Sequence, residues 1–262
     1  MGIVNVTPDS FSDGGQFFDS RRAIAHAQEL VAQGADILDV GAESTRPGAR
    51  VVPAEEELER LMPVLEGLRD VGVPISIDTS KPVVMRAVLA AGASMINDVN
   101  ALQTEGALAA VRDSECGICL MHSKGTPQTM QSLAQYQDVV GEVKQFLARR
   151  VAACEAAGIA RERLVIDPGF GFAKRSPHTL ILLRELRALT DLGVPVLAGI
   201  SRKSTLGKIT GQPDGERLSA SVAAAMLAAQ RGAAIVRVHD VAPTRDALLV
   251  MQAIEDPQFE LP

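Results

Sequence analysis

The chain has 262 residues and a formal net charge of −6, and 47% of its residues are hydrophobic while only 3% are aromatic. This length suits one large domain with a core built from Ala, Val, Ile and Leu. The negative charge argues against a general nucleic-acid surface, and no apolar run reaches the roughly 18 residues that a membrane span needs. Met1 leads directly into a strand pattern without a basic leader, so we expect a cytoplasmic protein without a signal peptide.

Strand-like segments alternate with helix-like segments along the whole chain. Short apolar runs predict strands at Gly2–Val6, Asp36–Gly41, Pro74–Thr79, Ser94–Asn100, Gly117–His122, Leu164–Gly169, Val194–Ser201 and Ala234–His239. Helical spacing predicts helices at Arg21–Gln33, Pro53–Val71, Pro82–Ala91, Glu105–Arg112, Val139–Ala157, Pro177–Leu192, Arg217–Arg231 and Pro243–Ile254. Such alternation indicates a parallel sheet, and eight units predict an α/β fold, a (β/α)8 TIM barrel. No linker divides the chain, so residues 1–262 are expected to form a single domain.

Polar side chains stand at the carboxyl ends of five predicted strands. They are Asp78, Asn97, Asp167, Lys203, Arg237 and His239. Side chains alternate along a strand, so Arg237 and His239 share one face, opposite to the neighbouring valines. Helices cover the outward face of a parallel barrel, so the polar set is expected at the barrel mouth, where barrel enzymes place their chemistry.

A network of buried salt bridges is the alternative explanation, because an isolated charge in an apolar strand is costly unless it is paired. Taken singly, each of the six residues is compatible with either explanation. Six together, at the ends of five strands, favour a functional site.

The polar residues fall into two chemical groups. The acceptors are Asp78, Asn97 and Asp167, and the donors are Thr45, Arg46, Arg237 and His239. Acceptors suit the N–H groups on the aminopyrimidine edge of a flat nitrogen heterocycle. Donors suit phosphate oxygens, and Lys203 could serve either group. The sequence therefore predicts a heterocycle pocket beside an anion pocket.

Other chemistries are poorly supported. Cys116 and Cys119 form a Cys-x-x-Cys pair, but positions three apart on a strand point to opposite faces, so free thiols are expected rather than a redox or metal pair. No Gly-x-Ser-x-Gly sequence marks a nucleophile. His26 and His178 lie in helical patterns and are expected to be solvated, which argues against a zinc site. His122 ends a strand and could line the pocket or orient a loop, and we favour orientation.

Eight motifs follow one another along the chain. They are residues 1–15 (MGIVNVTPDSFSDGG), 39–48 (DVGAESTRPG), 77–82 (IDTSKP), 96–99 (INDV), 120–122 (LMH), 167–172 (DPGFGF), 201–204 (SRKS) and 237–241 (RVHDV). In this order they closely resemble the motifs of the dihydropteroate synthase family, and the resemblance spans nearly the whole chain. Members of that family condense 6-hydroxymethyl-7,8-dihydropterin diphosphate with 4-aminobenzoate to give 7,8-dihydropteroate and diphosphate. The resemblance implies a TIM barrel, a Mg2+ cofactor, a homodimer and a target of sulfonamides.

The resemblance also implies a role for individual residues. The pterin would be held by Asp78, Asn97, Asp167 and Lys203. The diphosphate would be held by Asn5, Thr45, Arg237 and His239, with Asn5 also near Mg2+. The aminobenzoate would be bordered by Thr45, Arg46, Pro47, Phe172, Lys203 and Ser204. The candidate catalytic residues are Asp167, Lys203, Arg237 and His239.

The expected reaction is SN1-like and begins with loss of diphosphate from the pterin methylene. Mg2+, Arg237 and His239 would offset the growing charge on the leaving group, and the pterin-site carboxylates would favour the cation left behind. The amine of aminobenzoate would then attack. The loops Asn5–Phe18 and Gly41–Pro53 are expected to close over the site and exclude water.

Two alternative functions remain open at this point. A pterin-binding methyltransferase would share the barrel and the acidic pterin site but needs no grip on diphosphate, and the motifs at 45–48 and 201–204 argue against it. A catalytically silent relative that binds a pterin or a partner protein is the second alternative. Against it stand residues that are all present, namely Asn5, Asp9, Arg46, Lys203 and His239. Diphosphate release on mixing both substrates would distinguish the three functions.

Overall fold

Eight short parallel strands form the centre of the molecule. The computed structural model describes residues 1–6, 16–44 and 48–258, and the side chains of residues 16–19 lie outside that description. The strands are β1 (Gly2–Asn5), β2 (Leu38–Gly41), β3 (Ile75–Asp78), β4 (Met95–Asp98), β5 (Gly117–Met121), β6 (Leu164–Asp167), β7 (Val196–Ala198) and β8 (Ala233–Val236). They pair in chain order, and every pairing is parallel. The alternation of strands and helices therefore gives the predicted parallel α/β sheet.

The sheet curls so that its first and last strands approach each other. β8 and β1 do not pair along their length, but Gly2 and Val238 form one parallel bridge. The Ile3 amide donates to the Val238 carbonyl at 3.0 Å, and the Val238 amide donates to the Met1 carbonyl at 2.9 Å. These contacts bring the segment after β8 next to the amino-terminal strand.

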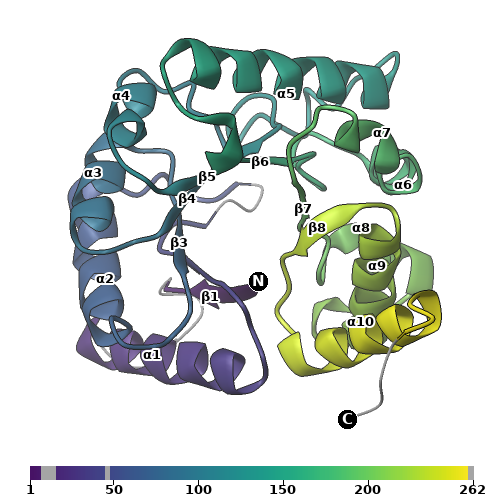
Figure 1. Ribbon diagram of the computed structural model, residues 1–262, viewed down its shortest axis with the longest axis horizontal. Helices are drawn as coiled ribbons and strands as arrows, with labels where there is room; N and C mark the ends of the chain where they lie inside the picture. The colour runs from purple at the N-terminus through teal and green to yellow at the C-terminus, as the bar shows by residue number, and fades with distance from the viewer. Residues whose placement is uncertain (7–15, 45–47, 259–262) are drawn as a thin grey trace.

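Helices surround the curled sheet on its outer side (Figure 1). They are α1 (Gln16–Ala32), α2 (Ala54–Gly67), α3 (Pro82–Ala90), α4 (Ala107–Arg112), α5 (Val139–Ala156), α6 (Ser176–Arg184), α7 (Arg187–Thr190), α8 (Ser204–Thr210), α9 (Leu218–Gln230) and α10 (Val241–Glu255). Among the helices in the described part of the chain, none combines the length and the apolar character needed to cross a membrane.

The core has two parts, one on each face of the strands. The larger part lies between strands and helices, and the smaller part contains Met1, Met95, Cys119 and Leu197. Cys116 belongs to the larger part, so the two cysteines of the Cys-x-x-Cys pair point to opposite faces, as predicted. Cys116, Cys119 and Cys154 are all buried free thiols.

Strand ends differ from their predicted positions. β7 spans only Val196–Ala198, where the sequence predicts Val194–Ser201. β8 ends at Val236, so Arg237 and His239 lie just beyond the strand instead of within it. After β7 the backbone turns into a loop, whereas after β8 it stays beside the sheet through the Arg237 amide, which donates to the Ala198 carbonyl at 3.0 Å, and through the bridge between Val238 and Gly2.

Two helical regions also differ. The predicted helix Pro177–Leu192 is two helices, α6 and α7, separated at Glu185 and Leu186. The helix α8 has seven residues and begins directly after Lys203. So short a segment contains too few apolar residues for a periodic pattern, and the sequence does not predict it.

Candidate active site

The polar side chains predicted at strand ends converge on one rim of the sheet. Asp78 and Asn97 are opposite each other in the register of β3 and β4. A Cβ added to Gly199 would lie 3.9 Å from Asp167 Oδ2 and 3.8 Å from Arg237 Cβ. The missing side chain at residue 199 thus leaves room for the Asp167 carboxylate and the aliphatic part of Arg237 to lie close together. The prediction that these groups share one end of the fold is confirmed.

A carboxylate that the strand-end pattern does not single out lies at the centre of this cluster. Asp39 is fully buried within β2. Its Oδ2 accepts hydrogen bonds from Arg237 Nε at 2.5 Å and from Asn97 Nδ2 at 3.2 Å. Its Oδ1 has no hydrogen-bond partner among the described residues. A lone charge inside the apolar run Leu38–Gly41 is the sequence signal that could have identified it.

Arg237 joins two carboxylates. Besides its bond to Asp39, its Nη2 lies 3.3 Å from Asp78 Oδ2. The predicted separation of acceptors from donors does not hold at this residue, because a half-buried guanidinium needs carboxylates nearby to offset its loss of hydration. Burial alone would lower the pKa of Arg237, but Asp39 and Asp78 raise it above its usual value, so the guanidinium stays charged.

Asp78 is the carboxylate of this cluster that can change its charge near neutral pH. Burial raises the pKa of Asp78 to about 7, the neighbouring Asp39 adds to the rise, and Arg237 opposes it. Loss of hydration and a like charge both favour the protonated form. This carboxyl can therefore be an acceptor above that pH and a donor below it.

Asp167 and Lys203 form the second part of the site. Asp167 Oδ1 accepts a hydrogen bond from the Gly169 amide at 2.6 Å. Burial raises the pKa of Asp167, and Lys203 is the main opposing influence. Burial lowers the pKa of Lys203 to about 8, against the effect of Asp167. Lys203 Nζ donates to the Phe170 carbonyl and lies 4.7 Å from the centre of the Phe172 ring, so it packs against the aromatic side chain.

His239 is held by Ser201. Ser201 Oγ lies 3.0 Å from His239 Nδ1, and the His239 amide donates to the same oxygen at 3.2 Å. Two contacts on one buried hydroxyl fix the imidazole relative to the end of β7. The predicted residue Ser204 is exposed at the first position of α8, directly after Lys203.

Some predicted site residues cannot be placed in this cluster. Thr45, Arg46 and Pro47 lie outside the described residues, as do residues 7–15 of the first predicted loop, including Asp9. Asn5 is exposed at the end of β1, beside Gly41 in the strand register. In the described part of the chain, no group of three or more His, Cys, Asp and Glu residues is arranged to hold a metal ion.

A buried ion cluster supports the segment that leads into residues 45–47. Lys81, just before α3, contacts the carboxylates of both Glu43 and Glu57. Glu57 is fully buried, and Glu43 Oε1 accepts a hydrogen bond from the Val52 amide at 2.9 Å. The sequence does not reveal this cluster, because its members come from three separate segments and follow no common pattern.

Two histidines outside the cluster have structural contacts. His122 is buried, and its Nδ1 lies 2.9 Å from Lys174 Nζ, a contact that supports a role in orienting a neighbouring segment. His178 is expected to be solvated, but it is half-buried, because its ring packs 5.1 Å from that of Tyr136 and its Nδ1 accepts from the Arg175 amide at 3.2 Å. The side chain of His178 is therefore only partly solvated.

Comparison with known proteins agrees with this geometry. Residues 1–239 match the family described as "Pterin binding enzyme". The chain is 53% identical to the dihydropteroate synthase of Neisseria meningitidis serogroup B over 261 residues. This match covers 97% of this chain and 92% of that protein. It is 48% identical to the dihydropteroate synthase of Escherichia coli K12 over 254 residues, 97% of this chain and 90% of that protein.

Solved structures of such enzymes share the fold. The Xanthomonas albilineans dihydropteroate synthase with 4-aminobenzoic acid is 54% identical, covers 100% of this chain and 93% of its own, and superposes with a TM-score of 0.92. The complex of the same enzyme with 7,8-dihydropteroate gives 50% identity, coverage of 100% and 94%, and a TM-score of 0.88. The chain therefore belongs to the dihydropteroate synthases within the pterin-binding enzyme family.

Proposed function

We propose that this protein condenses 6-hydroxymethyl-7,8-dihydropterin diphosphate with 4-aminobenzoate, giving 7,8-dihydropteroate and diphosphate for folate biosynthesis. The observation that carries this proposal is the arrangement of Asp39, Asp78 and Asn97 around the guanidinium of Arg237. It sets acceptors for the N–H groups of a pterin beside a cation for a diphosphate. The Xanthomonas albilineans complexes with 4-aminobenzoic acid and with 7,8-dihydropteroate support the same pair of substrates.

The pterin is proposed to bind to Asp78, Asn97, Asp167 and Lys203. Asn97 and Asp167 are buried, so their acceptors are held in place before the ligand arrives. We add Asp39 to this group, because a ligand N–H would satisfy an oxygen that is buried without a partner among the described residues.

The diphosphate is proposed to bind to Asn5, Thr45, Arg237 and His239, with Mg2+ beside Asn5. The donor set fits this cation, since Mg2+ takes oxygen ligands, commonly one or two from protein and the rest from phosphates and water. Asn5 offers an exposed amide oxygen at the end of β1. When bound, Mg2+ offsets negative charge on the diphosphate. Binding of the pterin diphosphate is therefore expected to weaken when a chelator removes Mg2+.

The aminobenzoate is proposed to bind beside Thr45, Arg46, Pro47, Phe172, Lys203 and Ser204. Of the described members, Lys203 lies against the Phe172 ring, and Ser204 follows Lys203 directly. The ammonium of Lys203 thus stands between this pocket and Asp167, at the boundary of the two substrates.

The residues of the rim suit a path in which the leaving group departs first. The bond between the pterin methylene carbon and the diphosphate oxygen breaks, and Arg237 and His239 stabilise the released diphosphate. Burial raises the pKa of Asp167 and the charge of Lys203 opposes that rise, and in its ionised form this carboxylate would favour positive charge on the pterin. The amine nitrogen of aminobenzoate then bonds to the methylene carbon and loses a proton to solvent. The loops Asn5–Phe18 and Gly41–Pro53 are proposed to exclude water from this step.

The finer architecture is also part of the proposal. A closed (β/α)8 TIM barrel formed by residues 1–262 as one domain is supported by the strand order and by the bridge between Gly2 and Val238. The homodimer and the cytoplasmic location rest on the family resemblance of the sequence motifs.

The proposal is tested by mixing the purified protein with both substrates and Mg2+. Diphosphate and dihydropteroate should form in equal amounts. Asp167→Asn and Arg237→Ala should each lower kcat/KM about 100-fold or more. Asp191→Asn and Arg184→Ala change exposed residues and should leave kcat/KM unchanged. A methyltransferase or a binding protein would release no diphosphate, and that result, or near-normal rates in both site variants, would refute the proposal.

A further inference from the structure

The turn after β6 is shaped by side chains from other parts of the chain. Its residues belong to neither helix nor strand, and φ is positive at Gly169 (68°), Gly171 (81°) and Ala173 (48°). Three successive carbonyls of this turn accept hydrogen bonds from side chains. The donors are Lys203 Nζ to Phe170, Gln131 Nε2 to Gly171 at 3.3 Å, and Lys174 Nζ to Phe172 at 3.0 Å. Because this backbone is not part of a helix or strand, we expect these side-chain donors to hold its conformation.

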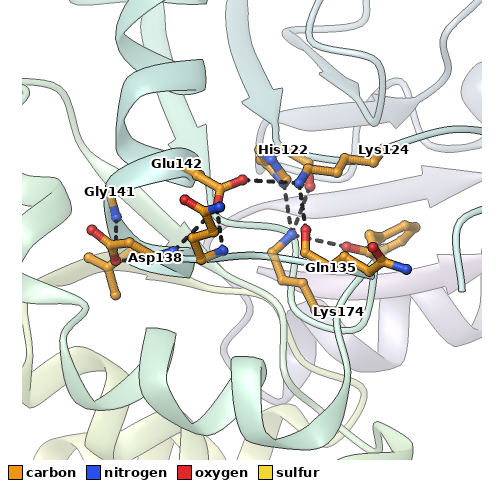
Figure 2. A network of polar contacts seen from close by, with 10 residues as sticks. His122, Lys124, Gln135, Asp138, Gly141, Glu142 and Lys174 are labelled. Carbon is orange, nitrogen blue, oxygen red and sulfur yellow. Dashed lines mark hydrogen bonds and ion pairs between the residues drawn. The ribbon is translucent and has the colours of Figure 1, made fainter. Parts of the chain in front are cut away.

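Lys174 is the buried member of the three donors. Its side chain is almost completely inaccessible, with 3% of the residue surface exposed. Besides the Phe172 carbonyl, its Nζ contacts the His122 carbonyl at 3.2 Å and His122 Nδ1 at 2.9 Å. Lys174 Nζ thus has three hydrogen-bonding partners, all of them in the turn after β6 or at the end of β5. Figure 2 shows Lys174 and His122 joined in this way, beside the contacts of Lys124 with Gln135 and Glu142.

The partner of Lys174 is itself immobilised. The His122 ring packs edge-on against Phe146 with centroids 4.8 Å apart, and against Tyr136 at 6.1 Å. Burial lowers the pKa of His122 to about 2, so the imidazole is neutral and can accept a hydrogen bond from Lys174. Burial also lowers the pKa of Lys174, and the charge of Asp167 opposes that effect. Lys174 therefore ties the Phe172 backbone to a fixed point at the end of β5.

We infer that Lys174 is a positioning residue for the aminobenzoate pocket, acting through the backbone of Phe172. The inference rests on the proposed function, in which the Phe172 ring borders that pocket. The other end of the turn is fixed separately, because Asp167 ends β6 and accepts the Gly169 amide. Loss of Lys174 should thus displace the aromatic end of the turn and leave the carboxylate end in place.

The test compares Lys174→Met with Lys144→Met. Lys144 makes a surface ion pair with Asp191 on the outside of α5, so its replacement is the same chemical change away from the turn. In Lys174→Met the KM for 4-aminobenzoate should rise about tenfold, equivalent to about 1.4 kcal/mol. The KM for the pterin diphosphate should change by less than about threefold. Lys144→Met should change neither value.

A second variant guards against failure of Lys174→Met to fold. Gln131→Ala removes the donor to the neighbouring Gly171 carbonyl from an exposed side chain. It should raise the KM for 4-aminobenzoate about threefold without raising the KM for the pterin diphosphate. The inference about Lys174 would be overturned if a folded variant changed the KM for 4-aminobenzoate and the KM for the pterin diphosphate equally. It would also be overturned if a folded variant changed neither KM.

A readout independent of turnover separates this inference from the proposed function. The Phe172 amide donates to the Gly169 carbonyl at 3.1 Å within the turn, and the His122 amide donates to the Asp167 carbonyl at 2.9 Å beside it. Lys174→Met should speed hydrogen exchange at Phe172 and leave His122 protected. If the wild-type protein makes no dihydropteroate, the proposed function fails, while exchange still decides whether Lys174 holds the turn. If hydrogen exchange at the Phe172 amide is the same in Lys174→Met and in the wild type, the inference that Lys174 positions Phe172 is overturned.

Discussion

At the scale of single residues, the site depends on charges that are buried together. Asp39 is inaccessible, and Arg237 retains its charge because two carboxylates lie beside it. Removing one member of such a group leaves the other charge without compensation in a poorly hydrated place. The residue that sequence patterns did not single out is therefore expected to be among the most sensitive to substitution.

Replacing Asp39 with alanine should lower the free energy of unfolding by about 3 kcal/mol, because the half-buried Arg237 loses its closest carboxylate. Asp39→Asn retains a carbonyl oxygen as acceptor and should lower the free energy of unfolding by less than Asp39→Ala does. Urea unfolding followed by circular dichroism measures both changes. Asp36→Ala, at a side chain that is 86% exposed, should stay within about 0.5 kcal/mol of the wild type. An Asp39→Ala protein as stable as the wild type would contradict this account.

The pH dependence of activity should follow Asp78 and Lys203. The carboxylate of Asp78 forms as the pH rises through about 7, and the ammonium of Lys203 is lost as the pH rises through about 8. Because kcat/KM reports the free enzyme, its value for the pterin diphosphate should peak between these values and fall on both sides. Lys203→Arg keeps a positive charge and should abolish the decrease of kcat/KM at alkaline pH. A profile that is flat across this range in the wild type would disprove the assignment.

Sequence reasoning could locate the rim because an apolar strand that ends in a charge is a local signal. Asp78 and Asp167 carry this signal. Lys174 does not, since it lies in a loop without periodicity, and its partners become neighbours only when β5 and β6 pair. A contact between a side chain and a distant backbone carbonyl leaves no trace in the spacing of residues.

At the scale of elements, the strands were more predictable than the connections that follow them. All eight strands occur where apolar runs predict them, because burial on both faces requires such runs. Their ends could not be predicted, because hydrogen bonding to the neighbouring strand decides where a strand stops. The short helix α8 depends on its position after Lys203 and on packing against α9, neither of which is a local property.

The start of α5 provides a prediction at this scale. Asp138 caps the helix, and its Oδ1 accepts from the amides of Val140 at 3.2 Å and Gly141 at 3.1 Å. Asp138→Ala should lower stability by about 1 kcal/mol through loss of the cap. Thermal unfolding would measure the loss, and Glu155→Ala near the other end of the helix is the matched exposed control. A change smaller than that of the control would show that the cap contributes nothing.

At the scale of the whole molecule, the closest approach of the first and last strands depends on a residue without a side chain. A Cβ added to Gly2 would lie 3.1 Å from Leu30 Cδ1 and 3.3 Å from Val241 Cγ2, both tight distances. The absence of that atom lets β1 fit between α1 and α10 and reach Val238. The approach of the two ends of the sheet is therefore limited by packing around Gly2.

Gly2→Val should destabilise the protein by about 1–3 kcal/mol through overpacking. It should also speed hydrogen exchange of the Ile3 and Val238 amides, which make the bonds between the two ends of the sheet. Gly215→Val is the control, since a Cβ there meets nothing within 4 Å. Exchange at Ile3 and Val238 that matches the control would show that closure does not depend on Gly2.

The ion pair between Arg237 and Asp39 joins positions 198 residues apart. During synthesis, a chain that has emerged only as far as β7 contains the inward carboxylate but not the cation that neutralises it. The rim can therefore assemble only after translation has passed the eighth strand. A product that terminates before Arg237 would retain most of the sheet yet leave Asp39 without its counter-ion.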